Sequence, residues 1–118
     1  MIGSPLFRMF VISVLFLACN SENHIKDLVN SPNTCEQING YLKINKGNYA
    51  PFQNTLLQTT RDDKKIDLCL EHYGKNVRWA KIKALEKITG TKLPYEYNAF
   101  TLDSTAFDFY RQLLLAKK

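Results

Sequence analysis

The chain has 118 residues, a net charge of +5 and hydrophobic residues at 45% of its positions. This length allows one small domain at most, with a core of modest size. The positive charge is mild and lacks the dense lysine and arginine footprint of a nucleic-acid-binding protein, so nucleic acid is not an expected partner.

The first 18 residues have the composition of an export signal. Arg8 is the one charged side chain among them, and it precedes an apolar block at residues 9–18. The block is about half the roughly 20 residues that span a bilayer as a helix, and it fits the apolar region of a signal peptide. We therefore expect residues 1–18 to be a signal peptide. The alternative is a short buried helix at the start of a cytosolic domain.

The residues "FLAC", which end at Cys19, resemble a bacterial lipobox. In that motif the cysteine becomes the new N-terminus and carries lipid, so the resemblance implies lipid attachment at Cys19. Phe16 departs from the leucine that is usual three positions before the cysteine. The resemblance implies a periplasm-facing lipoprotein of the bacterial envelope, with plain secretion as the alternative. Residues 19–33 are polar and have no clear period, which predicts a tether.

Two further cysteines, Cys35 and Cys69, remain if Cys19 takes lipid. In an oxidising compartment an even pair predicts one disulfide. A bridge across this separation restricts the unfolded chain by about 4 kcal/mol on the chain-entropy estimate. The alternative is a pair of buried free thiols.

Residues 34–118 are predicted to form the folded domain, because apolar residues recur there at helical spacing. The first predicted helix spans residues 34–44, with Asn33 or Thr34 as its cap. Its apolar positions are Cys35, Ile38, Tyr41 and Leu42.

Two more helices are predicted in the middle of the chain. One spans residues 49–60, with Pro51 in the first turn, where a missing N–H is tolerated. The next follows Asp62 or Asp63 and ends at Gly74, which is placed to take the left-handed conformation. The apolar stripe of that helix is Ile66, Cys69, Leu70 and Tyr73.

The last two helices give the clearest pattern. One spans residues 77–90 after the cap Asn76, and it is apolar on two sides, which predicts a helix enclosed between neighbours. The other follows Asp103 and buries Ala106, Phe107, Tyr110, Leu113 and Leu114. The predicted fold class is therefore all-α, a small bundle of about five helices.

The segment from about Asp62 to Phe100 resembles a helix pair of the HEAT-like repeat type. The residues that carry the resemblance are "DDKKIDLCLEHYG", "VRWAKIKALEKITG" and the aromatic stretch that follows. It covers roughly a third of the chain, and no second copy is visible at the period expected of such repeats. The resemblance implies stacked helix pairs and a scaffold for binding, since a fold does not fix a function.

Catalytic and metal-binding patterns are not evident in the sequence. His72 follows Cys69 by three residues, a spacing that allows a shared zinc ion or a thiolate–imidazole pair. A disulfide-bonded cysteine beside a surface histidine is the favoured interpretation, because no second ligand pair with zinc spacing exists. The sequence also lacks a glycine-rich phosphate loop and a nucleophile elbow. We therefore predict no enzyme activity, no metal and no cofactor.

Basic residues cluster around the predicted helix at residues 77–90, with aromatic residues nearby. The cluster could bind an acidic protein surface, anionic lipid or nucleic acid, but a solvated helix face is the favoured interpretation because the spacing covers several faces of the helix. The residues assigned to partner binding are Arg78, Trp79, Lys81, Lys83 and Tyr95.

The expected function is that of an exported, lipid-anchored module that binds a protein, either to neutralise a toxin or enzyme or to hold an envelope partner. The alternatives are a structural envelope lipoprotein without a specific partner, and a small hydrolase or metal carrier that uses His72.

Overall fold

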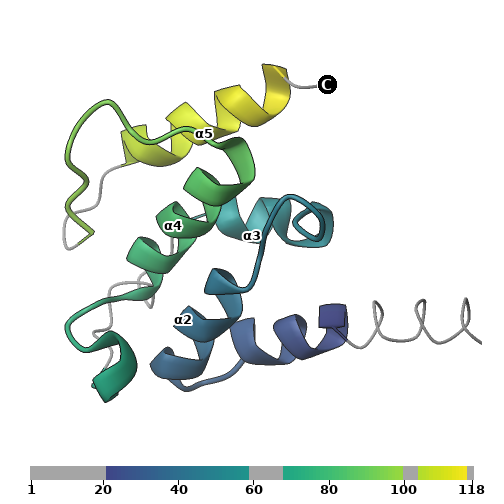
Figure 1. The fold of residues 1–118 in the computed structure, drawn as a ribbon, viewed down its shortest axis with the longest axis vertical. Coiled ribbons are helices and arrows are strands. Elements are labelled where there is room, and N and C mark those ends of the chain that lie inside the picture. The colour runs from purple at the N-terminus through teal and green to yellow at the C-terminus, as the bar shows by residue number, and fades with distance from the viewer. Residues whose placement is uncertain (1–20, 59–67, 100–103, 117–118) are drawn as a thin grey trace, which may run out of the picture.

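The computed structural model describes residues 21–58, 68–99 and 104–116, and over these ranges the chain is all-α (Figure 1). The predicted fold class is confirmed. Residues 21–29 are helical. They are followed by α2 (Thr34–Leu42), η1 (Ala50–Phe52), α3 (Gln53–Leu57), η3 (Leu70–His72), α4 (Val77–Thr89) and α5 (Ser104–Ala116), where η1 and η3 are short 3-10 helices.

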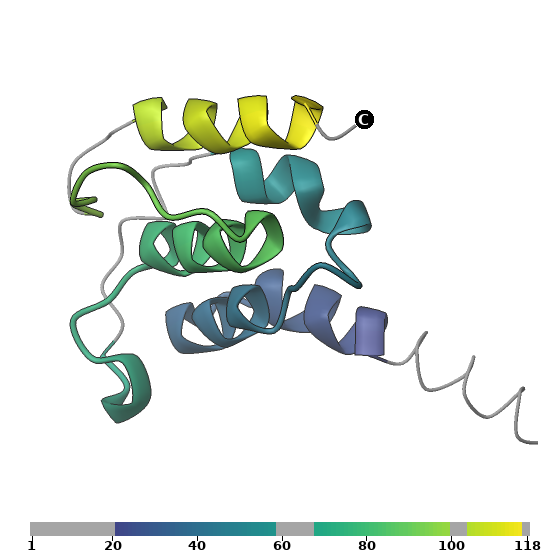
Figure 2. The same cartoon turned by 45° about the horizontal axis from the view of Figure 1, so that its top comes forward.

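Helix α4 is the centre of the fold, because α2, α3 and α5 all contact it. Figure 2 shows α4 in the middle of the molecule, with α5 on one side and α2 with the helix at 21–29 on the other. The core between these layers is a single cluster of buried apolar side chains. No helix in the described part of the chain is long and apolar enough to cross a membrane. Among the fully enclosed core residues are Ile38, Leu56, Ala80, Leu85 and Tyr110.

The predicted helix ends are confirmed at three sites. The Asn33 side chain accepts a hydrogen bond from a first-turn N–H of α2, and the Asn76 side chain does the same for α4. Gly90 follows α4 in the left-handed conformation, with φ 68°. Asp103, the expected cap of α5, lies outside the described residues.

The predicted apolar face of the last helix is confirmed, and the second predicted helix also buries one face. Phe52, Leu56 and Leu57 are buried, although the helix is short and its first turn, which contains Pro51, is the 3-10 helix η1. In α5 the buried positions are Ala106, Phe107, Tyr110 and Leu114, and Leu113 packs against the core.

The prediction of a polar tether at 19–33 is wrong for residues 21–29, which form a docked helix. Ile25 is 2% exposed and belongs to the core, and Val29 packs against it. A Cβ atom added at Gly40 would lie 2.8 Å from both Leu28 Cβ and Val29 Cγ1. Glycine at this position of α2 therefore lets the two helices approach closely. The folded body includes residues 21–29, and the predicted signal peptide and Cys19 lie outside the described residues.

The predicted helix that ends at Gly74 is also wrong in its described part, where η3 is a 3-10 turn. Leu70 and Tyr73 are 97% and 69% exposed, so these two positions of the expected apolar stripe are not buried, and Ile66 lies outside the described residues. The polar side chains make the contact with α2 instead. Asn39 donates to a Glu71 carboxylate oxygen at 3.4 Å, and its Oδ1 atom lies 2.7 Å from His72 Nε2.

The predicted disulfide between Cys35 and Cys69 is not formed in the structure. Both residues are partly buried, one in the first turn of α2 and the other directly before η3. The hydrogen bonds of Asn39 join these two elements without a covalent link. Without the bridge, the fold lacks the stabilisation of about 4 kcal/mol that a disulfide across this separation supplies.

Gly40→Ala will lower the free energy of unfolding by about 1–3 kcal/mol, although alanine is the better helix former by about 1 kcal/mol. The added methyl group overlaps Leu28 and Val29, and one of the contacts, at 2.9 Å, is to the backbone nitrogen of Val29. Urea unfolding followed by circular dichroism measures the change.

Gly47→Ala is the matched control, because the nearest atom to its added Cβ would be the Asn45 side-chain oxygen at 3.3 Å and its φ is not positive. We expect a change within about 0.5 kcal/mol there. A stabilising effect of Gly40→Ala would show that the helix at 21–29 does not pack on α2.

Candidate functional site

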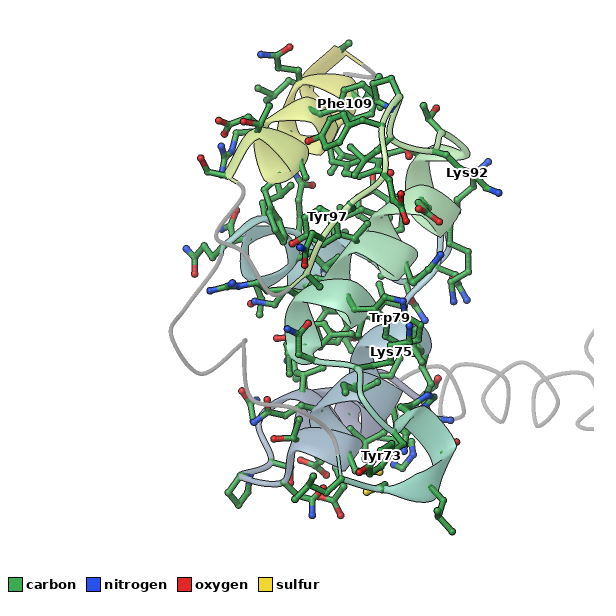
Figure 3. All side chains as sticks on the ribbon, turned by 90° about the vertical axis from the view of Figure 1, so that its left-hand side faces the viewer. Tyr73, Lys75, Trp79, Lys92, Tyr97 and Phe109 are labelled. Atoms are coloured by element: carbon green, nitrogen blue, oxygen red, sulfur yellow. The ribbon has the colours of Figure 1, made fainter. Side chains whose placement is uncertain are left out.

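Two cavities that share lining residues run along α4 and the non-helical segment 91–99, and together they are named the α4 groove. One, of about 470 Å³, lies between the start of α4 and residues 96–99. The other, of about 340 Å³, continues along α4 to Glu86. Figure 3 shows Lys75, Trp79, Tyr97 and Lys92 along one face of the molecule. The residues that line both cavities are Lys75, Trp79, Glu96 and Tyr97.

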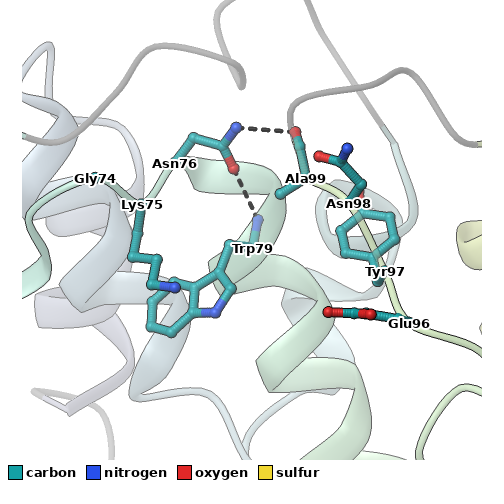
Figure 4. Close-up of a pocket in the computed structure, with 8 residues that line it drawn as sticks. All are labelled: Gly74, Lys75, Asn76, Trp79, Glu96, Tyr97, Asn98 and Ala99. Atoms are coloured by element: carbon teal, nitrogen blue, oxygen red, sulfur yellow. Dashed lines mark hydrogen bonds between the residues drawn. The ribbon is translucent and has the colours of Figure 1, made fainter.

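Asn76 joins the two walls of the α4 groove. Its Oδ1 atom accepts the Trp79 N–H at 3.0 Å, which caps α4, and its Nδ2 atom donates to the Ala99 carbonyl oxygen at 2.9 Å (Figure 4). The side chain is completely buried. One amide therefore fixes both the start of α4 and the far end of the segment 91–99.

Tyr110 of α5 fixes the near end of the same segment. Its hydroxyl donates to the Thr91 carbonyl oxygen at 3.0 Å and accepts from the Leu93 N–H. Burial raises the pKa of Tyr110 to about 12, and the negative charge of Glu86 acts in the same direction. Because both ends are held, the wall of the groove is positioned by buried hydrogen bonds.

Tyr97 attaches the middle of the segment to α5. Its ring packs edge-on against Phe107, with 6.4 Å between ring centroids and an interplanar angle of 78°. Figure 4 shows the Tyr97 ring and the Trp79 indole on opposite sides of the cavity. The two aromatic residues therefore form facing surfaces of the groove.

Trp79 forms the floor of the groove, between charged side chains. The Lys75 Nζ atom lies 5.4 Å from the centroid of the Trp79 ring, which is a cation–π contact. On the α4 side of the groove, Lys83 and Glu86 form an ion pair at 3.6 Å. The groove thus combines an aromatic floor with a charged, solvent-exposed rim.

The structure brings three of the predicted partner-binding residues together. Trp79 lines both cavities, and Lys83 and Tyr95 line the second. Glu96 and Asn98 were missed by sequence reasoning, and their only signal was the aromatic-rich connection in which they lie.

Arg78 and Lys81 do not lie on this surface, because they are only 4% and 2% exposed. The Lys81 Nζ atom donates to the Gln58 carbonyl oxygen at 2.8 Å and lies 5.3 Å from the centroid of the Tyr41 ring. The expectation that these two cations face a partner is therefore wrong. These two side chains are buried because α2, α3 and α5 enclose most of α4, so basic side chains on several faces of the helix are covered.

Both histidines line a different cavity, beside α2 and η3. His24, Glu71 and His72 line it, and the Asn39 side chain holds the His72 ring. Within residues 21–58, 68–99 and 104–116 no group of three or more His, Cys, Asp or Glu side chains is placed to hold a metal ion. No family model matches the chain, and comparisons with curated proteins and with solved structures found no significant match.

Asn76→Ser will release the segment 91–99 while α4 keeps its cap, because serine can accept the Trp79 N–H but is too short to reach Ala99. We expect faster amide hydrogen exchange at residues 92–98, unchanged protection in α4 and a loss of about 1 kcal/mol in unfolding free energy. Hydrogen exchange with mass spectrometry measures the first two.

Asn33→Ser makes the same substitution at the cap of α2, where the side chain accepts the Glu36 N–H at 3.1 Å. It should change unfolding free energy by less than about 0.5 kcal/mol and leave exchange in 92–98 unaltered. Loss of protection in α4 without a change at 92–98 would contradict the role given to Asn76.

The stability of the protein will fall as pH rises from about 10 to about 12, because the unfolded chain loses the Tyr110 proton in this range while the folded chain retains it. The contribution of Tyr110 is complete below pH 10 and amounts to about 2–3 kcal/mol at most. Tyr110→Phe should remove this part of the pH dependence in urea unfolding measured on both sides of pH 10. Tyr73→Phe, which changes an exposed tyrosine at the other end of the molecule, should keep the slope of the parent chain. Equal slopes for all three chains would contradict the assignment.

Proposed function

We propose that this chain is an exported protein-binding module, anchored in the bacterial envelope by lipid at Cys19, and that its α4 groove receives a segment of the partner. The observation that carries the proposal is a groove whose wall is fixed by the buried groups of Asn76 and Tyr110 and whose floor is Trp79. Binding to a pre-positioned groove requires little ordering of the module, which favours affinity.

The lining of the groove indicates the chemistry of the partner segment. The faces of Trp79 and Tyr97 suit an apolar or aromatic side chain, and tryptophan and tyrosine are common anchors of protein interfaces. The exposed amines of Lys75, Lys83 and Lys92 border the groove, and two carboxylates, Glu86 and Glu96, are interspersed with them. We infer that the partner presents an apolar anchor flanked by acidic residues, so that its carboxylates meet Lys83 and Lys92.

The lipid anchor would hold the domain close to the membrane. Cys19 stands two residues before the helical stretch that the structure describes from residue 21, and two residues span at most about 7 Å. Since residues 21–29 are docked on α2, they do not act as a spacer. A partner of the α4 groove is therefore expected at the membrane surface.

A photo-crosslinking amino acid at position 95 will yield one discrete protein adduct in intact cells, because Tyr95 lines the α4 groove. The same amino acid at position 112, an exposed residue of α5, should not yield that adduct. Adding Lys83→Glu and Lys92→Glu to the position-95 chain should strongly reduce the adduct, since charge reversal at the rim repels an acidic segment. Gel mobility and mass spectrometry of the tagged chain provide the measurement.

Lys26→Glu, which reverses an exposed charge on the helix at 21–29 outside the residues that line the groove, is the control for charge reversal and should leave the adduct unchanged. Cys19→Ser tests the anchor separately, and it should move the chain from the membrane fraction to the soluble fraction. Identical adduct patterns at positions 95 and 112, or none at either, would exclude the α4 groove as the binding site.

A further inference from the structure

The turn at η3 exposes apolar side chains, whereas its His72 faces the protein and the Glu71 side chain is 64% exposed. Leu68, Leu70 and Tyr73 are 80%, 97% and 69% exposed and are together named the η3 tip. His72, between them, is held by Asn39 and has a side chain only 15% exposed. Large apolar side chains that gather on a surface while a polar neighbour is enclosed mark a contact site rather than ordinary surface composition.

The η3 tip projects from one side of the molecule. Figure 2 shows η3 extending beyond α2 on the side away from α5, and the helix at 21–29 lies on the same side. Figure 3 places Tyr73 at the end of the molecule opposite Phe109. The tip and the helix at 21–29 therefore lie on the same side of α4, with the tip and the start of that helix at opposite ends of the α2 layer (Figure 1).

Two lysines accompany the tip, together with the exposed Glu71 carboxylate within η3. Lys75, an exposed residue, follows Tyr73 by two positions. Lys43, at the C-terminal end of α2, lines the cavity that Glu71 and His72 also line. Leucine and tyrosine side chains can enter a lipid surface, and lysine amines can pair with its phosphates. The region of the tip contains both kinds of side chain.

We propose that the η3 tip inserts into the interfacial region of an anionic phospholipid bilayer. Leu68 and Leu70 enter the boundary of the acyl chains, Tyr73 lies at the level of the headgroups, and Lys43 and Lys75 meet lipid phosphates. The inference rests on the proposed envelope anchoring, which brings the bilayer within reach. An acyl chain and a second, weaker contact together hold a protein more firmly than one chain alone.

A bilayer is favoured over a protein partner by the shape of the tip. The turn is convex, with its leucines directed outward, and a fluid lipid surface accepts such a turn without a matching pocket. The bonds of Asn39 to Glu71 and His72 hold the turn against α2, so its orientation is set before contact.

The test uses the full chain on vesicles of phosphatidylcholine and phosphatidylglycerol in equal parts, with brominated acyl chains as quenchers. Trp79, the one tryptophan of the chain, is replaced by Phe, and Tyr73→Trp places a reporter in the tip. We expect its emission to fall roughly twofold on the brominated vesicles relative to unbrominated ones, because it lies at the interface. Leu115→Trp in the same background is the matched control, since Leu115 is an exposed leucine of α5, and its emission should not change.

Leu70→Asp added to the Tyr73→Trp chain should restore the emission, and circular dichroism checks that all variants fold. The proposal would be overturned by any of three quenching results: none at position 73, equal quenching at 73 and 115, or quenching that survives Leu70→Asp. A chain that does not associate with the vesicles would also overturn it. The adduct formed from position 95 needs no tip contact, so its persistence beside failed quenching would reject the tip alone. Loss of that adduct on Leu70→Asp, without quenching by lipid, would assign the tip to a protein partner.

Discussion

A single buried amide, that of Asn76, joins the central helix to the segment that forms the opposite wall of the groove. Its oxygen accepts a hydrogen bond from one of the N–H groups that lack a partner in the first turn of α4. Its nitrogen donates to the carbonyl oxygen of Ala99, which is distant in sequence. Serine or aspartate also caps helices well, but neither supplies both a donor and an acceptor at these two positions. The identity of this residue therefore links the stability of α4 to the shape of the α4 groove.

Burial of long cations is the second constraint on the surface of this protein. Lys81 keeps its charge satisfied by a backbone carbonyl group and an aromatic ring, while its aliphatic stem contributes to the core. Lys75 and Lys83, on other faces of the same region, remain at the surface. Position on the central helix, rather than residue type, decides which basic side chains are accessible to a partner.

The sequence predicted the all-α class, the caps Asn33 and Asn76 and the enclosed character of α4, because caps and apolar periodicity are local signals. It did not predict the docked helix at 21–29, whose short apolar set of Ile25, Leu28 and Val29 stands among polar residues. The close contact at Gly40 and the bonds of Asn39 to η3 depend on tertiary packing. The sequence pattern indicates Trp79, Lys83 and Tyr95 as surface residues. The contribution of Glu96 and Asn98 to the groove depends on the packing of the segment 91–99 beside α4, which the sequence pattern does not reveal.

The close approach at Gly40 also has a consequence for the order in which the chain folds. The helix at 21–29 and α2 are neighbours in sequence, so their contact closes a short loop and needs no residue later in the chain. The groove needs Asn76 to reach Ala99 and Tyr110 to reach Thr91, and these partners are synthesised near the end of the chain. We therefore expect the binding surface to be the last part of the molecule to form, after the contact between the helix at 21–29 and α2.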